Sequence, residues 1–440
     1  MHQILRRYSA LLMAFALSIF STWWLNLAAA SAVPPHFQGD SLGYWQLATT
    51  LSRAGTFNSL TRTPLYPGFL AWIAQASLSA AIVTQTCLTL LIAFGAYQIT
   101  RNGEGESSRA PALAALLIGA SFNVNAAAGW ILTETLFTFL LVVMVWAILR
   151  ASQHKHLYRY MFGAGLLCGM LALCRPIALY LGIGLVGFLC THSRLRRRPG
   201  AIGIFILCGA LLPATWAWRN FTQTGNFTLS TIAAINLYEY RAAWIVAQTE
   251  HISPQVAQAD LRARFKRELG DRTMTEAEQA QRYTRKALKI LADAPLLTLR
   301  QGLEGLARIF LDFNNFESKL LCSYLASRAA STHTQRDQGL YAPCKAGLII
   351  YQAVFLLVVY VGIGLIPMCW RTFGGDSRFL IALAAALIAY FALLSAGAEA
   401  NVRFRMPFEP LLCVLSALGW SRWTKAPWVP GRLQNSGASS

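Results

Sequence analysis

The sequence predicts an all-α, polytopic membrane protein with about ten transmembrane helices. Three observations lead to this prediction. The 440 residues are 55% hydrophobic and only 13% charged, whereas soluble domains are about 25% charged. Long apolar segments recur along the chain, and basic residues gather in the short connections between them. Because these connections account for much of the net charge of +19, the charge does not indicate a nucleic-acid partner.

The first predicted span follows the basic residues Arg6 and Arg7. Roughly 22 mostly apolar residues come next, enough to cross a bilayer at about 1.5 Å per residue. The span ends in Leu27–Ala32, which is typical of a signal-peptidase site. The apolar run is longer than an ordinary signal sequence, which favours an uncleaved anchor. In either case we expect the following loop to face away from the cytoplasm.

Further apolar segments predict the rest of the bundle: 80–99, 111–122, 134–149, 160–174, 177–190, 201–217, 346–369, 379–396 and 407–421. The segment from Leu65 to Ser79 is expected to be a half-buried helix instead of a crossing. Basic clusters recur on the side of the N-terminus: Arg101/Arg109, Arg150/Lys155/Arg159, Arg194/Arg196/Arg197/Arg198, Arg371/Arg378 and Arg422/Lys425. Positive charge marks the cytoplasmic side, so both termini are expected in the cytoplasm of a cell inner (plasma) membrane protein.

This pattern divides the chain into four predicted parts. They are an N-terminal transmembrane module (1–218) with an amphipathic first outer loop (32–79), an extracytoplasmic helical loop region (219–345), the last spans (346–423) and a disordered cytoplasmic tail (424–440). Within the outer region, Ser253 to Ala292 has the periodicity of an amphipathic helix.

Two cysteines, Cys322 and Cys344, flank a basic loop that contains Arg328 and Arg336. In an oxidising compartment they could form a disulfide. Two free thiols at the membrane edge are the alternative.

Asp40 is the only acidic residue between Met1 and Gly103, and it lies in the first outer loop just before a helical pattern from Leu42 to Arg53. Its carboxylate could simply cap that helix. A carboxylate that is ionised and fixed in direction at a membrane surface can also act as a general base. Tyr44 lies four residues later, on the same helical face.

Basic residues are expected on the same side as Asp40: Arg53, Arg62, Arg175, Arg219, Arg403 and Arg405. Charged groups beside hydrocarbon are costly and are usually paired or functional. The guanidinium group matches two phosphate oxygens at once, so these arginines are candidates to bind a phosphate carried by a lipid. Contact with ordinary lipid headgroups is the alternative for each of them.

Glu134 opens the fourth span, where a helix N-terminus favours a carboxylate. A role in binding donor or acceptor is the alternative. Glu399 and Glu409 are expected to pair with Arg403 and Arg405.

Metal and cofactor chemistry find little support in the sequence. His36 lies close to Asp40, but the other histidines are scattered, and the nine cysteines form no C-x-x-C pair. The sequence contains no phosphate-binding P-loop, dinucleotide loop or nucleophile elbow. We therefore expect no cofactor and no metal.

Several short segments resemble the GT-C type membrane glycosyltransferases, in particular the protein mannosyltransferase and aminoarabinose transferase group. The residues that carry the resemblance are, in order, Gly39–Tyr44, Arg62–Gly68, Leu132–Leu136, Cys174–Pro176, Trp218–Phe221 and Arg403–Pro407. Many relatives have paired acids in the first loop, whereas this chain has Asp40 followed by Ser41.

The resemblance implies transfer of a sugar from a polyprenyl-phosphate donor to an extracytoplasmic acceptor, with Asp40 as general base. It also implies arginines that hold the lipid phosphate. Tyr44, Tyr66 and Glu134 join the arginines as candidate substrate-binding residues. The alternatives are a transporter or flippase, which would favour repeated halves and polar residues at the bilayer midplane, and a non-catalytic assembly factor for envelope polysaccharide.

Overall fold

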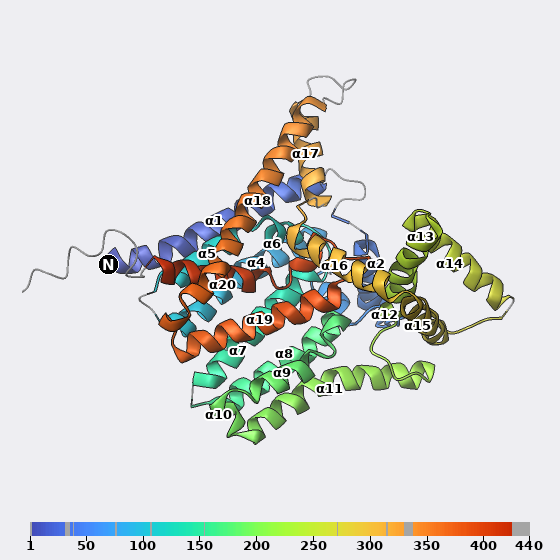
Figure 1. Cartoon of the computed structure of the whole chain (residues 1–440), viewed down its shortest axis with the longest axis horizontal. Helices are drawn as coiled ribbons and strands as arrows, with labels where there is room; N and C mark the ends of the chain where they lie inside the picture. The colour runs from blue at the N-terminus through green and yellow to red at the C-terminus, as the bar shows by residue number, and fades with distance from the viewer. Residues whose placement is uncertain are drawn as a thin grey trace, which may run out of the picture.

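A computed structural model describes residues 2–30, 36–37, 39–74, 77–105, 108–153, 155–270, 272–313, 316–329 and 338–424. Every regular element in these ranges is a helix, and they assemble into one bundle with a helical unit beside it (Figure 1). The predicted all-α fold is therefore confirmed.

Seven helices in the described part of the chain are long and apolar enough to cross a membrane. They are α1 (His2–Ala30), α4 (Leu78–Glu104), α7 (Glu134–Gln153), α8 (Leu157–Cys174), α11 (Pro199–Thr224), α18 (Gln338–Met368) and α19 (Gly375–Ser395). Three apolar helices are shorter: α5 (Ala110–Ala120), α9 (Leu181–Leu189) and α20 (Glu409–Trp423). The chain is a multi-pass membrane protein, and the count of about ten spans stays a prediction because a straight crossing needs about 20 residues.

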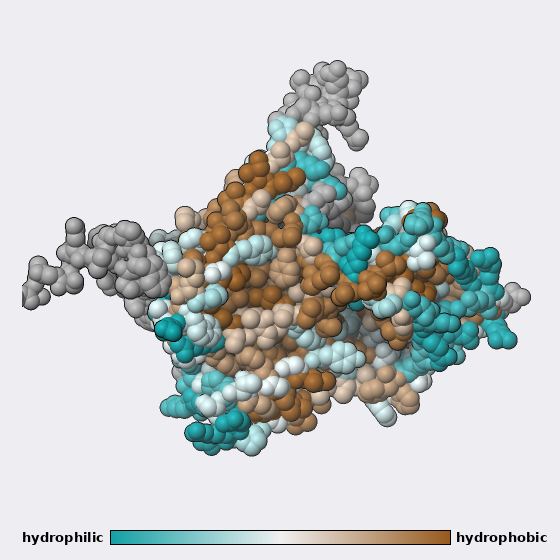
Figure 2. All heavy atoms as spheres, in the orientation of Figure 1, coloured by the Kyte–Doolittle hydropathy of each residue, from teal (hydrophilic) through white to brown (hydrophobic). Residues whose placement is uncertain are grey.

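Hydrophilic residues gather at two opposite ends of the bundle, with a hydrophobic band between them (Figure 2). At one end Arg422 forms an ion pair of 2.7 Å with Glu104, and the Ser377 hydroxyl donates to the Gly103 carbonyl. Several of the loops in which the sequence predicts basic clusters thus lie together at this end of the bundle. The short helix α10 (Ser193–Arg196) lies there too.

The first outer loop lies at the opposite end and is built from α2 (Ser41–Ala54) and α3 (Leu65–Ala74). Helix α2 ends at Gly55, whose φ of +65° favours glycine. With only 10 residues, α3 is too short to cross a bilayer, and it buries Tyr66 and Leu70. It is the half-buried helix that the sequence predicted.

The outer helical unit follows α11 and consists of α12 (Ile232–Ile235), a π-helical turn η2 (Asn236–Ala242), α13 (Ala243–Glu250), α14 (Pro254–Leu269) and α15 (Glu276–Asp293). It has its own core, in which the Tyr283 ring lies 4.3 Å from Tyr238 and 4.7 Å from Phe265 between centroids. The segment from Ser253 to Ala292 is helical as predicted, but it forms two helices, because Gly270 at φ +59° ends α14 and a capping box at Thr275 starts α15.

Helix α16 (Pro295–Leu311) leads back to the bundle, and α17 (Phe316–Ala329) then packs along α18 (Figure 1). Cys322 on α17 and Cys344 on α18 have their sulfur atoms 2.6 Å apart. The disulfide between them stays a prediction. The Arg336 side chain, the Arg328 side chain and residues 425–440 of the predicted tail lie outside the described residues.

Four short helices complete the chain: α6 (Phe122–Ala127), η1 (Pro176–Ala178), η3 (Trp370–Thr372) and η4 (Val402–Arg405). Of these, η1 and η4 lie directly beside the candidate site described below.

Helices α8 and α11 pack so closely that a side chain at Gly165 has no room. A Cβ atom there would lie 2.6 Å from the Phe205 carbonyl oxygen, whereas a Cβ at Gly163 on the same helix would meet nothing within 4 Å. We expect Gly165→Val to destabilise the protein by about 1–3 kcal/mol, visible as a lower midpoint of thermal unfolding in detergent. Equal midpoints for Gly165→Val and the control Gly163→Val would contradict this packing.

Candidate active site

Asp40 pairs with Arg62 at the entrance to the first outer loop. Arg62 Nη2 donates to Asp40 Oδ1 at 2.7 Å, and the Asp40 side chain is half exposed. Asp40 occupies the N-cap position of α2, but its side chain accepts no hydrogen bond from the backbone of the helix. The capping alternative therefore does not describe this carboxylate, which is oriented by a guanidinium group.

A chain of contacts fixes the position of Arg62. Its guanidinium lies 4.5 Å above the centroid of the Tyr44 ring, and that ring packs edge-on against Tyr66 at 5.2 Å. The buried Tyr66 hydroxyl donates to Gln85 Oε1 at 2.8 Å, and Gln85 Nε2 in turn donates to the Trp130 carbonyl at 2.8 Å. The direction of Arg62 is thus tied to α4 and to the loop before α7.

The charges around Asp40 keep it ionised. Burial by itself would raise the pKa of Asp40, but the hydrogen bond and the charge of Arg62, together with the charge of Arg403, lower it below its ordinary value of 3.8. Burial raises the pKa of Tyr44 above its ordinary value of 10.0. At neutral pH the site therefore presents a carboxylate beside a neutral phenol.

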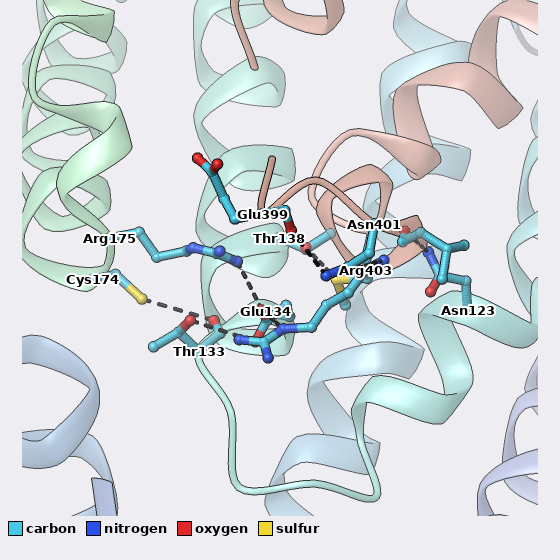
Figure 3. A network of polar contacts seen from close by, with 11 residues as sticks. Asn123, Thr133, Glu134, Thr138, Cys174, Arg175, Glu399, Asn401 and Arg403 are labelled. Carbon is cyan, nitrogen blue, oxygen red and sulfur yellow. Dashed lines mark hydrogen bonds and ion pairs between the residues drawn. The ribbon is translucent and has the colours of Figure 1, made fainter. Parts of the chain in front are cut away.

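Glu134 is the centre of a second group of charges, and its side chain is only 1% exposed. Arg175 Nη1 donates to Glu134 Oε1 at 3.0 Å, and Arg403 Nε donates to the same oxygen. Figure 3 shows the two guanidinium groups reaching the carboxylate from different elements. One buried carboxylate thus holds two arginines, and the group carries a net charge of +1.

The two arginines come from places where the backbone leaves regular helix. Arg175 ends α8 in an extended conformation before Pro176, and Arg403 lies in η4, where the Asn401 side chain accepts from its N–H at 2.9 Å. Arg175 is 14% exposed and Arg403 is 28% exposed. Both guanidinium groups are therefore oriented by Glu134 while part of their surface stays open.

The two groups of charges form one site. Burial would lower the pKa of Arg403, but the charges of Glu134 and Asp40 raise it, so Asp40 lies within electrostatic reach of Arg403. The site brings together most of the residues that the sequence predicted: Asp40, Tyr44, Arg62, Tyr66, Glu134, Arg175 and Arg403.

Arg405 is not part of this open site. It is 2% exposed and pairs with the buried Glu409 at 2.9 Å, while its Nη1 donates to the Ile309 carbonyl at 3.0 Å. The predicted Arg405–Glu409 pair is confirmed. Because these donors are used inside the protein, the structure places Arg405 in a structural pair and not beside an open phosphate site.

Glu399 does not pair with Arg403, so that prediction is wrong. Its carboxylate points away from Arg403 (Figure 3) and instead accepts from Arg241 Nε at 3.0 Å and from Arg241 Nη2 at 2.9 Å. Arg308 Nη2 also donates to the Gly397 carbonyl at 3.2 Å. Arg241 thus fastens the hairpin that carries Arg403 to the outer helical unit, and Arg308 fastens it to α16.

Sequence reasoning missed Arg241. It is separated from Glu399 by 158 positions, and its neighbours in the sequence carry no motif that points to the hairpin. A π-helical turn at 236–242 holds it there, and such turns cluster at functional sites, but nothing in the local sequence predicted this one.

Two further candidate arginines lie on or against the first outer loop. Arg219 Nη2 donates to the Phe57 carbonyl, and its guanidinium lies 4.8 Å above the Trp216 ring. It therefore braces the first outer loop against α11. Arg53 lies exposed on α2 and has no ion pair within the described ranges.

No group of three metal-ligating side chains occurs among the residues with described positions. His36 Nδ1 lies 3.1 Å from the Gly129 carbonyl oxygen, so this ring nitrogen has a hydrogen-bond partner in the backbone.

An apolar groove of about 690 Å³ lies between α8, α9 and α11. Its lining includes Cys168, Ala172, Ile183, Pro213, Phe227 and Leu229. The lining also includes Ala178, which lies three residues beyond Arg175. None of the residues of the charged site is part of this lining.

Comparisons with known proteins agree with this architecture. The family model "Dolichyl-phosphate-mannose-protein mannosyltransferase" matches residues 64–218. Among solved structures, the chain is similar to an oligosaccharyltransferase from Archaeoglobus fulgidus tethered with an acceptor peptide, with 14% identity over 95% of this chain and 49% of that one and a TM-score of 0.53. No curated protein matches.

A second match is ArnT from Cupriavidus metallidurans bound to undecaprenyl phosphate, with 12% identity over 94% of this chain and 78% of that one and a TM-score of 0.42. This chain spans about half the length of the archaeal enzyme. The family match and the shared fold confirm the resemblance to membrane glycosyltransferases, and the chain has the fold of such an enzyme.

Removing the charge of Glu134 would leave two guanidinium groups without their shared carboxylate. Because breaking a buried ion pair costs about 3–5 kcal/mol, we expect Glu134→Gln to lower the thermal unfolding midpoint strongly. The exposed pair of Glu304 and Arg300 offers a control, since such pairs contribute at most about 1 kcal/mol. Equal midpoints for Glu134→Gln and Glu304→Gln would contradict the structural role of Glu134.

Proposed function

We propose that this protein transfers a sugar from a polyprenyl-phosphate donor to an acceptor hydroxyl or amine, with inversion at the anomeric carbon and Asp40 as general base. The observation that carries the proposal is the meeting of an ionised, arginine-oriented carboxylate with partly exposed guanidinium groups. Helix α8, which is followed directly by Arg175, also lines an apolar groove. Such a site suits a ligand that is part lipid and part phosphate.

The apolar groove supports the lipid part of the proposal. Its apolar lining offers an isoprenoid chain a favourable environment, because burial of apolar surface contributes about 25 cal/mol per Å². Ala178 lines the groove, and Arg175 lies three residues before Ala178 in the sequence. An isoprenoid chain bound in the groove would therefore place its phosphate near the charged site. A donor that cannot leave the bilayer would thus meet the protein at the membrane surface.

The arginines would stabilise the leaving group. As the bond from the anomeric carbon to the phosphate oxygen breaks, the departing phosphate gains negative charge. Arg403 and Arg175 are already oriented by Glu134, so little reorganisation would be needed when that charge develops. Fixed donors aimed at developing charge are usually the largest electrostatic contribution to catalysis.

Asp40 would act on the acceptor. Its half-exposed carboxylate would take the proton from the acceptor oxygen or nitrogen as that atom forms its bond to the anomeric carbon. Arg62 keeps the carboxylate ionised and directed. Attack from the face opposite the phosphate would invert the configuration at that carbon.

The proposed sidedness follows from the distribution of basic residues. The end that gathers Arg422 and the α10 arginines would face the cytoplasm, which would put Asp40 on the extracytoplasmic face of the inner membrane. An extracytoplasmic glycolipid, glycan or protein acceptor would then reach the site from the aqueous phase.

Replacing Asp40 tests the proposal directly. In Asp40→Asn the general base is removed while the shape of the side chain is kept, so we expect the rate of transfer to fall by about 10²–10⁴-fold. The measurement is loss of donor from a panel of polyprenyl-phosphate hexoses and pentoses, with purified protein in liposomes.

Asp293→Asn is the matched control, because Asp293 is exposed at the end of α15 and should leave the rate unchanged. Undiminished transfer by Asp40→Asn would remove Asp40 from the mechanism. Donor loss by neither wild type nor variant across the panel would remove the transfer reaction itself.

The pairing with Arg62 also predicts a pH dependence. Asp40 is a base only when ionised, so activity should fall as the pH drops through its folded-state pKa, which Arg62 holds below 3.8. In Arg62→Gln the lowering is lost, and we expect the acid limb of kcat/KM to move to higher pH by about 1–3 units.

The exposed Arg53, also on the first outer loop, provides the control Arg53→Gln, which should leave the acid limb in place. An acid limb that stays where it is in Arg62→Gln would show that another group controls it.

A further inference from the structure

A second pocket lies in the outer helical unit, at the turn between α14 and α15. It has a volume of about 290 Å³ and is lined by Leu269, Arg272, Thr273, Met274, Glu278, Gln281, Arg282 and Arg285. Unlike the groove between α8, α9 and α11, it is lined largely by polar and charged side chains. None of these residues belongs to the site around Asp40.

Three arginines and one glutamate give this pocket a net charge of +2. Arg272, Arg282 and Arg285 have no ion pair within the described part of the chain, whereas Arg262 and Arg264 in the same unit are each paired with carboxylates. The pocket therefore holds more guanidinium groups than its one carboxylate, Glu278, can neutralise.

The one carboxylate of the pocket is already engaged. Glu278 Oε2 accepts from the Thr275 N–H at 2.8 Å and from the Thr275 hydroxyl at 3.0 Å, and this capping box fixes the start of α15. The contact holds the glutamate at the helix terminus. The unneutralised arginines are then the groups left to meet a ligand.

The position of the pocket relates it to the membrane surface. Gln281 Nε2 donates to Asn226 Oδ1 at 3.4 Å, which ties the pocket to the loop after α11. Trp218, in the last two turns of α11, is 60% exposed, and Phe227, which directly follows Asn226, is 65% exposed. Exposed aromatic side chains at the end of a transmembrane helix mark the level of the lipid headgroups.

We infer that Arg272, Arg282 and Arg285 form a phosphate-binding site at the membrane surface, separate from the site around Asp40. A planar guanidinium group matches two phosphate oxygens, and three of them around one pocket suit a phosphate or pyrophosphate group. The phosphate belongs to a lipid headgroup or to a phosphorylated amphiphile that approaches along the bilayer. Binding there does not require the transfer reaction.

Titration of the full-length protein with inorganic pyrophosphate tests the site. The protein is held in an uncharged detergent at low salt, and binding is followed by calorimetry. We expect Arg282→Gln/Arg285→Gln to bind at least about tenfold more weakly than wild type, because two charge-assisted contacts are lost. Gln281→Glu, which adds a carboxylate to the pocket, should weaken binding as well.

The matched control is Lys266→Gln/Lys289→Gln, which removes the same charge from exposed positions on α14 and α15 outside the pocket. This control should bind as wild type does. Equal losses in the lysine control would overturn the proposal in favour of general attraction to a basic surface. Unchanged binding in the double arginine variant would overturn it as well.

Nanodiscs distinguish the two sources of the phosphate. If the occupant is a lipid headgroup, pyrophosphate should bind more weakly in nanodiscs that contain phosphatidylglycerol than in phosphatidylcholine nanodiscs, and the double arginine variant should lose this difference. Equal binding in both nanodiscs, with the loss in the double arginine variant retained, supports the site and assigns it to a phosphorylated amphiphile other than the bulk lipid.

Discussion

The buried carboxylate of Glu134 is the constraint on which the arrangement of the site depends. Charged groups beside hydrocarbon are costly unless they are paired, and Glu134 is paired on one oxygen by two arginines from remote parts of the chain. The start of α7, the end of α8 and the hairpin before α20 must therefore meet at one point. A requirement for charge neutralisation in a low dielectric thus becomes a requirement on the fold.

The outer helical unit takes part in the same arrangement through a different contact. Arg241 holds Glu399 with two donors, and Glu399 lies four residues before Arg403 in the same hairpin. The orientation of Arg403 is thus defined from the bundle by Glu134 and from the outer unit by the hairpin backbone. A displacement of the outer unit would be transmitted to the guanidinium group that we assign to the phosphate.

Much of the site could be predicted from the sequence because acidic residues are so rare in it. Asp40 and Glu134 are isolated charges in apolar surroundings, and in a membrane protein such charges need partners. The pairing could not be predicted, because ion pairs follow helix packing, which local periodicity does not encode. Arg403 was assigned to Glu399, four positions away, but the fold gives each of them a remote partner. Arg405 resembled Arg403 in the sequence, yet it is enclosed.

The charge balance of the site favours a ligand that brings its own negative charge. Asp40 and Glu134 face Arg62, Arg175 and Arg403, which leaves one positive charge unmatched in a site whose arginines are mostly covered. A neutral sugar alone would leave that charge in place, whereas a phosphate would neutralise it and gain from the low dielectric. In the reaction that we propose, the excess charge would favour the phosphate-linked form of a sugar, and after transfer it would hold the departing lipid phosphate beside the arginines until the next exchange.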